Sequence, residues 1–522
     1  MHRVRYIIFM LAILLLTAGV LQAQDDANTL HIVSGNDITT LDPAIGYDQI
    51  SWVAEPLVYR GLIAYDADFK TVGALADKID VSEDGTVYTF TIRDGAKFSN
   101  GRAVTAQDVK YTFERLFDPA TKSPGTFVYA MIQGAQEEMD GKTKELSGVE
   151  VIDDKTVRFT LTHPEYTFLT RLALNFGGIV AKEGVDAAGE DFAREPLGAG
   201  PYTLESWDAG QQAVFVRNPN YYEPGKPIID KIVIDIGVEA ATGYLRVESG
   251  EADLSIDDIQ GADYTHVASD PTLAEQLIKS RAFAQVSYIT LDLTKPPFND
   301  IRVRQAMNLA IDRDHLVQVM AGLAAPANGI IPPTVQGHNA DIPVTAYDPD
   351  QAKALLTAAG FLDGFSTQLQ TYNLPGPVRV SQAVVQDLAQ VGIKVDLQIM
   401  EFSAWLDVFF SHPTDSPMMF DTWGMDYADP TDAYEPLLAC GSASNPGSYC
   451  NADLDKQEQA AALIPPGDDR WKAFADLEAN IVKDQALMFL VYPQQYFFRS
   501  ARLQNLNSHP AYVLDFENAS LK

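Results

Sequence analysis

The sequence has 522 residues, with 71 acidic side chains against 38 basic ones, and its formal net charge at pH 7 is −33. A field of this sign repels nucleic acids and anionic membrane surfaces, so both are excluded as partners. A chain of this length exceeds what one hydrophobic core can organise, and we expect about three domains.

The N-terminus has the composition of a secretory signal. Arg3 and Arg5 precede an uncharged run over 6–21, and Ala23 comes just before the polar residues QDD. We therefore predict that residues 1–23 are a signal peptide that is removed on export. An uncleaved membrane anchor is the alternative, but the apolar run is at the short end for spanning a bilayer. No cysteine stands directly after the run, so we expect a periplasmic protein that is not a lipoprotein.

The only cysteines are Cys440 and Cys450, in the stretch CGSASNPGSYC. In an oxidising compartment, two cysteines placed across such a turn most simply form a disulfide, worth about 3 kcal/mol in the chain-entropy model. A free catalytic thiol is the alternative, and it is disfavoured because no histidine lies nearby in the sequence to activate it. The histidines have no metal-ligand spacing, and neither a metal nor a cofactor is predicted.

Residues 84–117 have the pattern of a strand followed by a helix. Tyr88, Phe90 and Ile92 would share one face of a strand, because side chains alternate along a strand. Thr105 and Asp108 have the spacing of a capping box that starts a helix. These patterns predict a strand-rich unit.

Later segments alternate between strands and helices. We expect hairpins that turn at 153–154 and 208–210 and a buried strand over 231–238. A helix with a proline start and a glycine stop is predicted over 347–361, and a helix followed by a half-buried strand over 380–400. This succession is typical of α/β lobes.

The common catalytic signatures are missing, including the zinc-protease helix motif, the nucleophile elbow, the Walker loop and the dinucleotide-binding glycine turn. Acidic pairs at 153–154 and 257–258 could act as hydrolase carboxylates. Aspartate is, however, favoured in turns because it hydrogen-bonds its own backbone. The sequence therefore favours a binding protein over an enzyme.

Eight segments, in order along the chain, resemble the extracytoplasmic solute-binding proteins of ABC importers, in the peptide, opine and nickel class known as family 5. Their order and spacing, rather than any single segment, make the resemblance specific. The segments are TLDP (40–43), GLIAYD (61–66), the stretch 74–116, LGAGPYTLESW (197–207), RNPNYY (217–222), KPPFNDIRVRQAMNLAIDR (295–313), YDPDQAKALLTAAGF (347–361) and WGMDYADP (423–430).

The resemblance implies an α/β fold of the large type II periplasmic-binding-protein class, with two lobes and an additional strand-rich domain. The solute would lie between the two lobes, which close around it. The implied division is lobe I over 24–59, 179–284 and 489–522, the additional domain over 60–178, and lobe III over 285–488.

The motif WGMDYADP supplies the main candidate for ligand binding. In peptide-binding members of the family, the aspartate three residues after the tryptophan forms a salt bridge with the ligand's α-amino group, and Asp426 has this position. An ionised carboxylate in a closing cleft is costly until an ammonium pairs with it. The resemblance also implies that Trp423 forms an aromatic wall and that the backbone of Gly424 and Met425 pairs with an extended ligand.

Further candidates come from two other segments. The stretch AIGYDQIS (44–51) is similar to a segment that touches the ligand in the family, which nominates Tyr47, Asp48 and Gln49. Tyr492 is a weaker candidate, for which a packing role is the alternative.

One departure from the family bears on the ligand. Dipeptide-binding members use an arginine to hold the ligand's carboxylate, whereas this sequence has Thr371 at the corresponding position. The nearest arginine, Arg379, is predicted to lie inside the following helix. A longer peptide or a cationic non-peptide solute therefore agrees better with the sequence than a free dipeptide.

The predicted function is that of a monomeric binding protein that captures a peptide or peptide-like amine and delivers it to an ABC permease driven by cytoplasmic ATPases. The alternatives are a secreted hydrolase of peptides or glycans, a binder of nickel chelates or oligosaccharides, and a chemoreceptor partner.

Overall fold

The computed structural model describes residues 28–66, 70–259, 261–280, 284–411, 417–442, 445–508 and 514–522. The predicted signal peptide lies outside these residues. Within them, no helix combines the length and the apolar character needed to cross a bilayer.

Lobe I is built on a seven-stranded sheet. Its central strand β1 is apolar and pairs in parallel with β10 and β11, while the hairpin partner β9 runs antiparallel to β10. The C-terminal strand β19 lies between β11 and β12. In spatial order the strands are β12 (Leu277–Lys279), β19 (Tyr496–Arg499), β11 (Leu254–Ser255), β1 (Thr29–Ser34), β10 (Lys231–Ile236), β9 (Gln212–Arg217) and β8 (Tyr202–Asp208).

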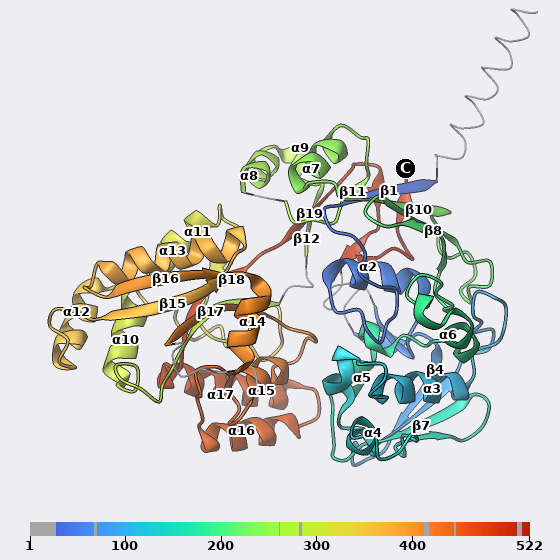
Figure 1. The fold of residues 1–522 in the computed structure, drawn as a ribbon, viewed down its shortest axis with the longest axis horizontal. Helices are drawn as coiled ribbons and strands as arrows, with labels where there is room; N and C mark the ends of the chain where they lie inside the picture. Colours follow the sequence, from blue (N-terminus) through green and yellow to red (C-terminus); the bar gives the residue numbers. More distant parts are fainter. Residues whose placement is uncertain are drawn as a thin grey trace, which may run out of the picture.

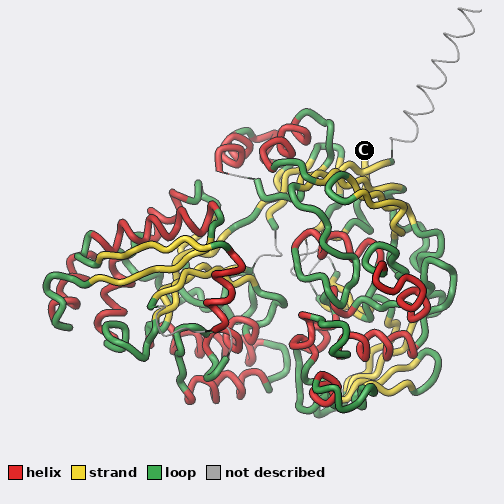
Figure 2. Tube along the Cα trace, in the orientation of Figure 1, coloured by secondary structure: helices red, strands yellow, loops and turns green. Residues whose placement is uncertain are grey.

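Lobe III is built on a six-stranded sheet, seen on the left of Figure 1. Strand β13 pairs antiparallel with β17 and β18, and β15 pairs in parallel with β16. Figure 2 shows helices on both sides of these strands, as expected for a sheet with two apolar faces. In spatial order the strands are β14 (Ala324–Pro326), β18 (Leu487–Pro493), β13 (Gln285–Leu291), β17 (Met418–Gly424), β15 (Ser366–Tyr372) and β16 (Lys394–Met400).

The additional domain contains a four-stranded antiparallel sheet packed against helix α3. The predicted strand face is confirmed, because Tyr88, Phe90 and Ile92 are all almost fully buried. The capping box is confirmed as well, since Asp108 accepts hydrogen bonds from the backbone and hydroxyl of Thr105. The strands are β4 (Ala76–Val81), β5 (Val87–Ile92), β7 (Thr156–Thr160) and β6 (Val149–Val151).

Sixteen α-helices, three short 3-10 helices and three two-stranded ribbons complete the described residues. The α-helices are α2 (Gln49–Val58), α3 (Ala106–Phe117), α4 (Ala135–Met139), α5 (Phe168–Leu172), α6 (Lys182–Ala188), α7 (Ala240–Glu248), α8 (Gly261–Ser269), α9 (Pro271–Ala274), α10 (Ile301–Ala310), α11 (Arg313–Val319), α12 (Pro349–Ala358), α13 (Pro375–Ala389), α14 (Phe402–Ser411), α15 (Thr431–Leu438), α16 (Ala452–Ala462) and α17 (Asp468–Asp484). The others are η1 (Pro124–Tyr129), η2 (Asn175–Gly177) and η3 (Gly189–Asp191), with β2 (Ile63–Tyr65) and β3 (Thr71–Gly73), β20 (Leu503–Gln504) and β23 (Ser520–Leu521), and β21 (Asn507–Ser508) and β22 (Leu514–Asp515).

The helix predicted over 347–361 is confirmed, with Asp348 as N-cap and Pro349 in its first turn. In the half-buried strand predicted to follow α13, Val395 and Leu397 are partly buried, but Ile399, which alternates with them, is 47% exposed. The reason is that β16 lies at the edge of its sheet, so its far end has few neighbours to pack against.

The chain crosses between the two large sheets at two places that lie side by side. One crossing leads from β12 to β13, and the other from β18 to β19. The backbone N–H of Ser280 donates to the carbonyl of Gln495 at 2.9 Å, which joins the two crossings. Strand β18 stays in the six-stranded sheet as far as Pro493, so the boundary expected at 489 falls inside a strand.

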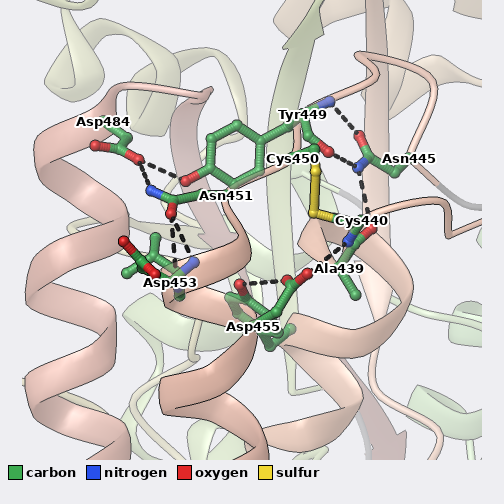
Figure 3. Close-up of a disulfide and its surroundings, with 11 residues drawn as sticks. Ala439, Cys440, Asn445, Tyr449, Cys450, Asn451, Asp453, Asp455 and Asp484 are labelled. Atoms are coloured by element: carbon green, nitrogen blue, oxygen red, sulfur yellow. Dashed lines mark hydrogen bonds between the residues drawn. A yellow bond between two sulfur atoms is a disulfide. The ribbon is translucent and has the colours of Figure 1, made fainter.

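The predicted disulfide between Cys440 and Cys450 is confirmed, with the two Cα atoms 4.5 Å apart. Figure 3 shows that this loop is also held by hydrogen bonds to helix α17. The hydroxyl of Tyr449 and the amide of Asn451 donate to Asp484 at 2.6 and 2.8 Å. The loop is therefore fixed both covalently and by polar contacts.

We expect the non-reduced protein to show no reactive thiol, and reduction to lower the free energy of unfolding by about 3 kcal/mol, because opening the loop returns chain entropy to the unfolded state. Urea unfolding with and without reductant measures the difference. The double variant Cys440→Ser/Cys450→Ser serves as the control and should not respond to reductant. Two reactive thiols in the native protein would contradict the prediction.

Candidate ligand-binding cleft

A cavity of about 320 Å³ lies between the two lobes. Lobe I contributes the start of α2, and lobe III contributes β17, the end of β15 and helix α14. Six of the residues nominated from the sequence line this cavity, although they come from segments almost 400 positions apart. They are Tyr47, Asp48, Gln49, Trp423, Gly424 and Asp426.

Asp426 is only 5% exposed, and its carboxylate makes a contact between the lobes. The hydroxyl of Tyr47 donates to its two carboxylate oxygens, at 3.0 and 3.2 Å. Burial raises the pKa of Asp426 to about 6, while the Tyr47 hydrogen bond and the positive charge of Arg171 act in the opposite direction. The cleft therefore holds a carboxylate whose charged form is stabilised by any donor that enters.

A second polar contact joins the additional domain to lobe III beside this carboxylate. Arg171, on α5, donates to the hydroxyl of Tyr427 at 2.7 Å, and its guanidinium lies 4.3 Å from the centre of that ring. The same guanidinium lies 3.8 Å from Glu435 and 3.9 Å from Glu165. Because Tyr427 follows Asp426 directly, Arg171 also supports the position of the loop that carries Asp426.

Hydrogen bonds from the motif to Asp432, which follows it, hold the loop in shape. The backbone N–H of Asp426 donates to a carboxylate oxygen of Asp432 at 2.7 Å, and the indole N–H of Trp423 donates to the carbonyl of Asp432 at 2.9 Å. Burial and the neighbouring charge of Asp426 raise the pKa of Asp432 well above its usual range. Across the cavity, Asp48 is the N-cap of α2, which fixes the lobe I wall.

Two nominated residues do not line the cavity. Met425 is 1% exposed and lies in the core, and its backbone N–H donates to the carbonyl of Ala284. Tyr492 is 5% exposed, and its hydroxyl donates to the side-chain oxygen of Asn328 at 2.8 Å. The structure therefore places both in packing positions, and their contact with a ligand stays a prediction.

The sequence reasoning missed one whole wall of the cavity. The additional lining residues are Trp52, Tyr372, Phe402, Trp405, Leu406, Phe409, Asp421 and Thr422. The available signal was the spacing of Phe402, Trp405 and Phe409, which places three aromatic rings on one face of α14. Such a stripe is more often part of a hydrophobic core. Here Trp405 and Phe409 belong to the core of lobe III, and all three rings also line the cavity.

The departure from the dipeptide-binding pattern has a clear structural form. Thr371 is fully buried within β15, and Arg379 lies inside α13 as predicted, with its side chain exposed. Neither residue lines the cavity.

The two-lobed fold and the cleft between its lobes define a class of protein that closes around a small solute. Residues 70–445 match the model of the middle region of the bacterial extracellular solute-binding proteins, family 5. The match covers more than half of the chain, and the protein belongs to this family.

Three similar proteins agree with this assignment. The chain is 29% identical over 505 residues to the glutathione-binding protein GsiB of Salmonella typhi, covering 95% of each chain. It is 30% identical over 455 residues to heme-binding protein A of Haemophilus influenzae, covering 82% of this chain and 80% of the relative. The solved structure of DppA from Helicobacter pylori with the peptide STSA has a TM-score of 0.76 and 26% identity, covering 94% and 98% of the two chains.

The raised pKa of Asp426 predicts how stability depends on pH. An unfolded aspartate loses its proton near pH 4, whereas the folded chain keeps the Asp426 proton up to about pH 6. The ligand-free protein therefore loses stability as the pH rises between these values. We expect Asp426→Asn to weaken this loss by up to about 3 kcal/mol, because asparagine has no proton to release.

Chemical unfolding at a series of pH values between about 4 and 7 measures this effect. Asp421, whose pKa burial also raises to about 6, keeps part of the pH dependence in the variant. The matched control is Asp363→Asn at an exposed loop position, which should follow the unsubstituted protein. If the free energy of unfolding changes with pH equally in Asp426→Asn and in the control, Asp426 does not have the raised pKa on which this prediction depends.

Proposed function

We propose that the protein captures a peptide or peptide-like amine outside the cytoplasm and delivers it to the permease of an ABC importer. The observation that carries this proposal is the Asp426 carboxylate, almost fully buried at the wall of the interlobe cavity and held from lobe I by Tyr47. An ammonium that enters the cavity can pair with this carboxylate by a charge-assisted hydrogen bond. The pairing favours the closed arrangement because groups from both lobes then face the ligand.

An extended ligand also has a backbone edge to pair with. Strand β17 pairs along its whole length with β13, but its pairing with β15 is limited to Met419 and Gln370. Beyond Met419, the described strands leave the β15 side of β17 open, towards the cavity lined by Thr422 and Gly424. A peptide in an extended conformation can add to such an edge as a further strand.

The similar proteins support a peptide-like solute. The names of the relatives include glutathione, which is a modified tripeptide, and heme, while one solved neighbour contains the peptide STSA. The feature that these names share is binding of a small solute. The predicted signal peptide and the acidic composition agree with a periplasmic protein that is free of the membrane.

We expect Asp426→Asn to lower the affinity for peptides with a free amino terminus at least about tenfold, because the charge-assisted bond to the ammonium is lost. The probe is a mixed tripeptide library, and thermal stabilisation and titration calorimetry measure binding. N-acetylated tripeptides should bind weakly to the unsubstituted protein and to Asp426→Asn alike. Unchanged affinity in the variant would remove Asp426 from the site.

We also expect the protein to return its ligand unchanged. After prolonged incubation with the tripeptide library, mass spectrometry should recover every bound peptide intact, since the role is binding and release. Cleavage products that disappear in Asp426→Asn or Asp421→Asn would instead favour the hydrolase alternative, because both carboxylates line the cavity.

A further inference from the structure

We infer that the cavity selects solutes in which an ammonium group lies next to an aromatic ring, and that it gains nothing from a ligand carboxylate. The inference rests on the proposed capture of an amine and adds the chemistry beside that amine. Two observations carry it: an aromatic wall on α14 and the distribution of charge around the cavity.

The aromatic wall is ordered by ring contacts. Phe402 and Trp405 stack with their ring centres 6.0 Å apart and their planes at 10°, and Trp405 stacks on Phe409 at 4.9 Å. Tyr372 meets Trp405 edge to face at 4.9 Å. The rings therefore hold one another in place before any ligand arrives, and a ligand ring that packs on them loses little to rearrangement.

The exposed fractions of the three α14 rings distinguish a surface that can bind a ligand from a purely structural core. Trp405 and Phe409 are each 2% exposed, whereas Phe402 is 50% exposed and lines the same cavity. A core alone would bury all three, since an exposed phenylalanine gains little from packing. Phe402 therefore presents the aromatic stripe to the cavity.

The charged side chains that line the cavity all have the same sign. Asp48, Asp421 and Asp426 supply three carboxylates, and the described lining residues include no lysine, arginine or histidine. Asp421 is almost fully buried and accepts hydrogen bonds from the hydroxyl of Tyr288 at 2.7 Å and from the backbone of Thr422. This field attracts a cation and repels a ligand carboxylate.

The two features are adjacent in the fold. Asp421 and Trp423 are two residues apart on β17, and both line the cavity together with Asp426. Tyr372 packs against Trp405 of α14 and against Phe420 of β17. A cation beside aromatic faces gains a further electrostatic attraction. The volume of about 320 Å³ is at the lower end for small-molecule sites. It suits one aromatic amine, or the first residues of a peptide that begins with an aromatic residue.

Titration calorimetry with matched ligands tests the inference. The reference ligand is phenylalanyl-alanyl-alanine amide, which we expect to bind at least about tenfold more tightly than glycyl-alanyl-alanine amide. The free acid of the reference peptide should bind no more tightly than its amide. Phenethylamine distinguishes a small aromatic amine from a peptide as the source of the shared chemistry.

Variants separate the wall from the rest of the site. Phe402→Ala should reduce the preference for the phenylalanyl peptide to about threefold or less, and Phe402→Leu, which keeps the bulk without the ring, should give an intermediate preference. Leu362→Ala is the control, because Leu362 is 75% exposed and does not line the cavity. Its preference should be unchanged.

The outcomes distinguish the two proposals. If the phenylalanyl and glycyl peptides bind equally well and both depend on Asp426, the proposed function stands and the aromatic selection is wrong. If the free acid binds tenfold more tightly than the amide, the charge argument is overturned. If none of the amines binds, the proposed function fails and the inference fails with it.

Discussion

The arrangement of the cleft depends on one buried carboxylate that two lobes share. Asp426 comes from lobe III, and the hydroxyl that donates to it belongs to Tyr47 of lobe I. A carboxylate removed from water is costly without a donor, and its pKa of about 6 reflects that cost. Because the donor belongs to the opposite lobe, this contact joins the two lobes at the cleft.

The surrounding structure supports this contact from several directions. Asp48 caps α2 while lining the cavity, so the same side chain shapes the lobe I wall and adds to its charge. Arg171 connects the additional domain to Tyr427, next to the Asp426 carboxylate. The additional domain therefore contacts lobe III beside the cleft. The two chain segments that connect lobe I with lobe III are joined to each other by the hydrogen bond from Ser280 to Gln495.

Local patterns in the sequence predicted the elements that depend on near neighbours. The strand face of Phe90 and the capping box of Thr105 follow from spacing alone, and both are observed. The position of Asp426 came from the resemblance, since no local rule distinguishes it from a loop aspartate. The aromatic wall was missed because Phe402, Trp405 and Phe409 have the spacing of an ordinary buried stripe. The contact from Arg171 to Tyr427 joins residues 256 positions apart, which no local pattern encodes. Ile399 is exposed because its strand is at a sheet edge, and strand order is a tertiary property.

The position of β19 within the seven-stranded sheet determines when lobe I can fold during synthesis. This strand comes from the last 30 residues, yet it lies between β11 and β12, two strands made long before it. Lobe I cannot complete its sheet until the C-terminus has left the ribosome. The seven-stranded sheet of lobe I therefore forms only after the strands of lobe III and of the additional domain have been synthesised.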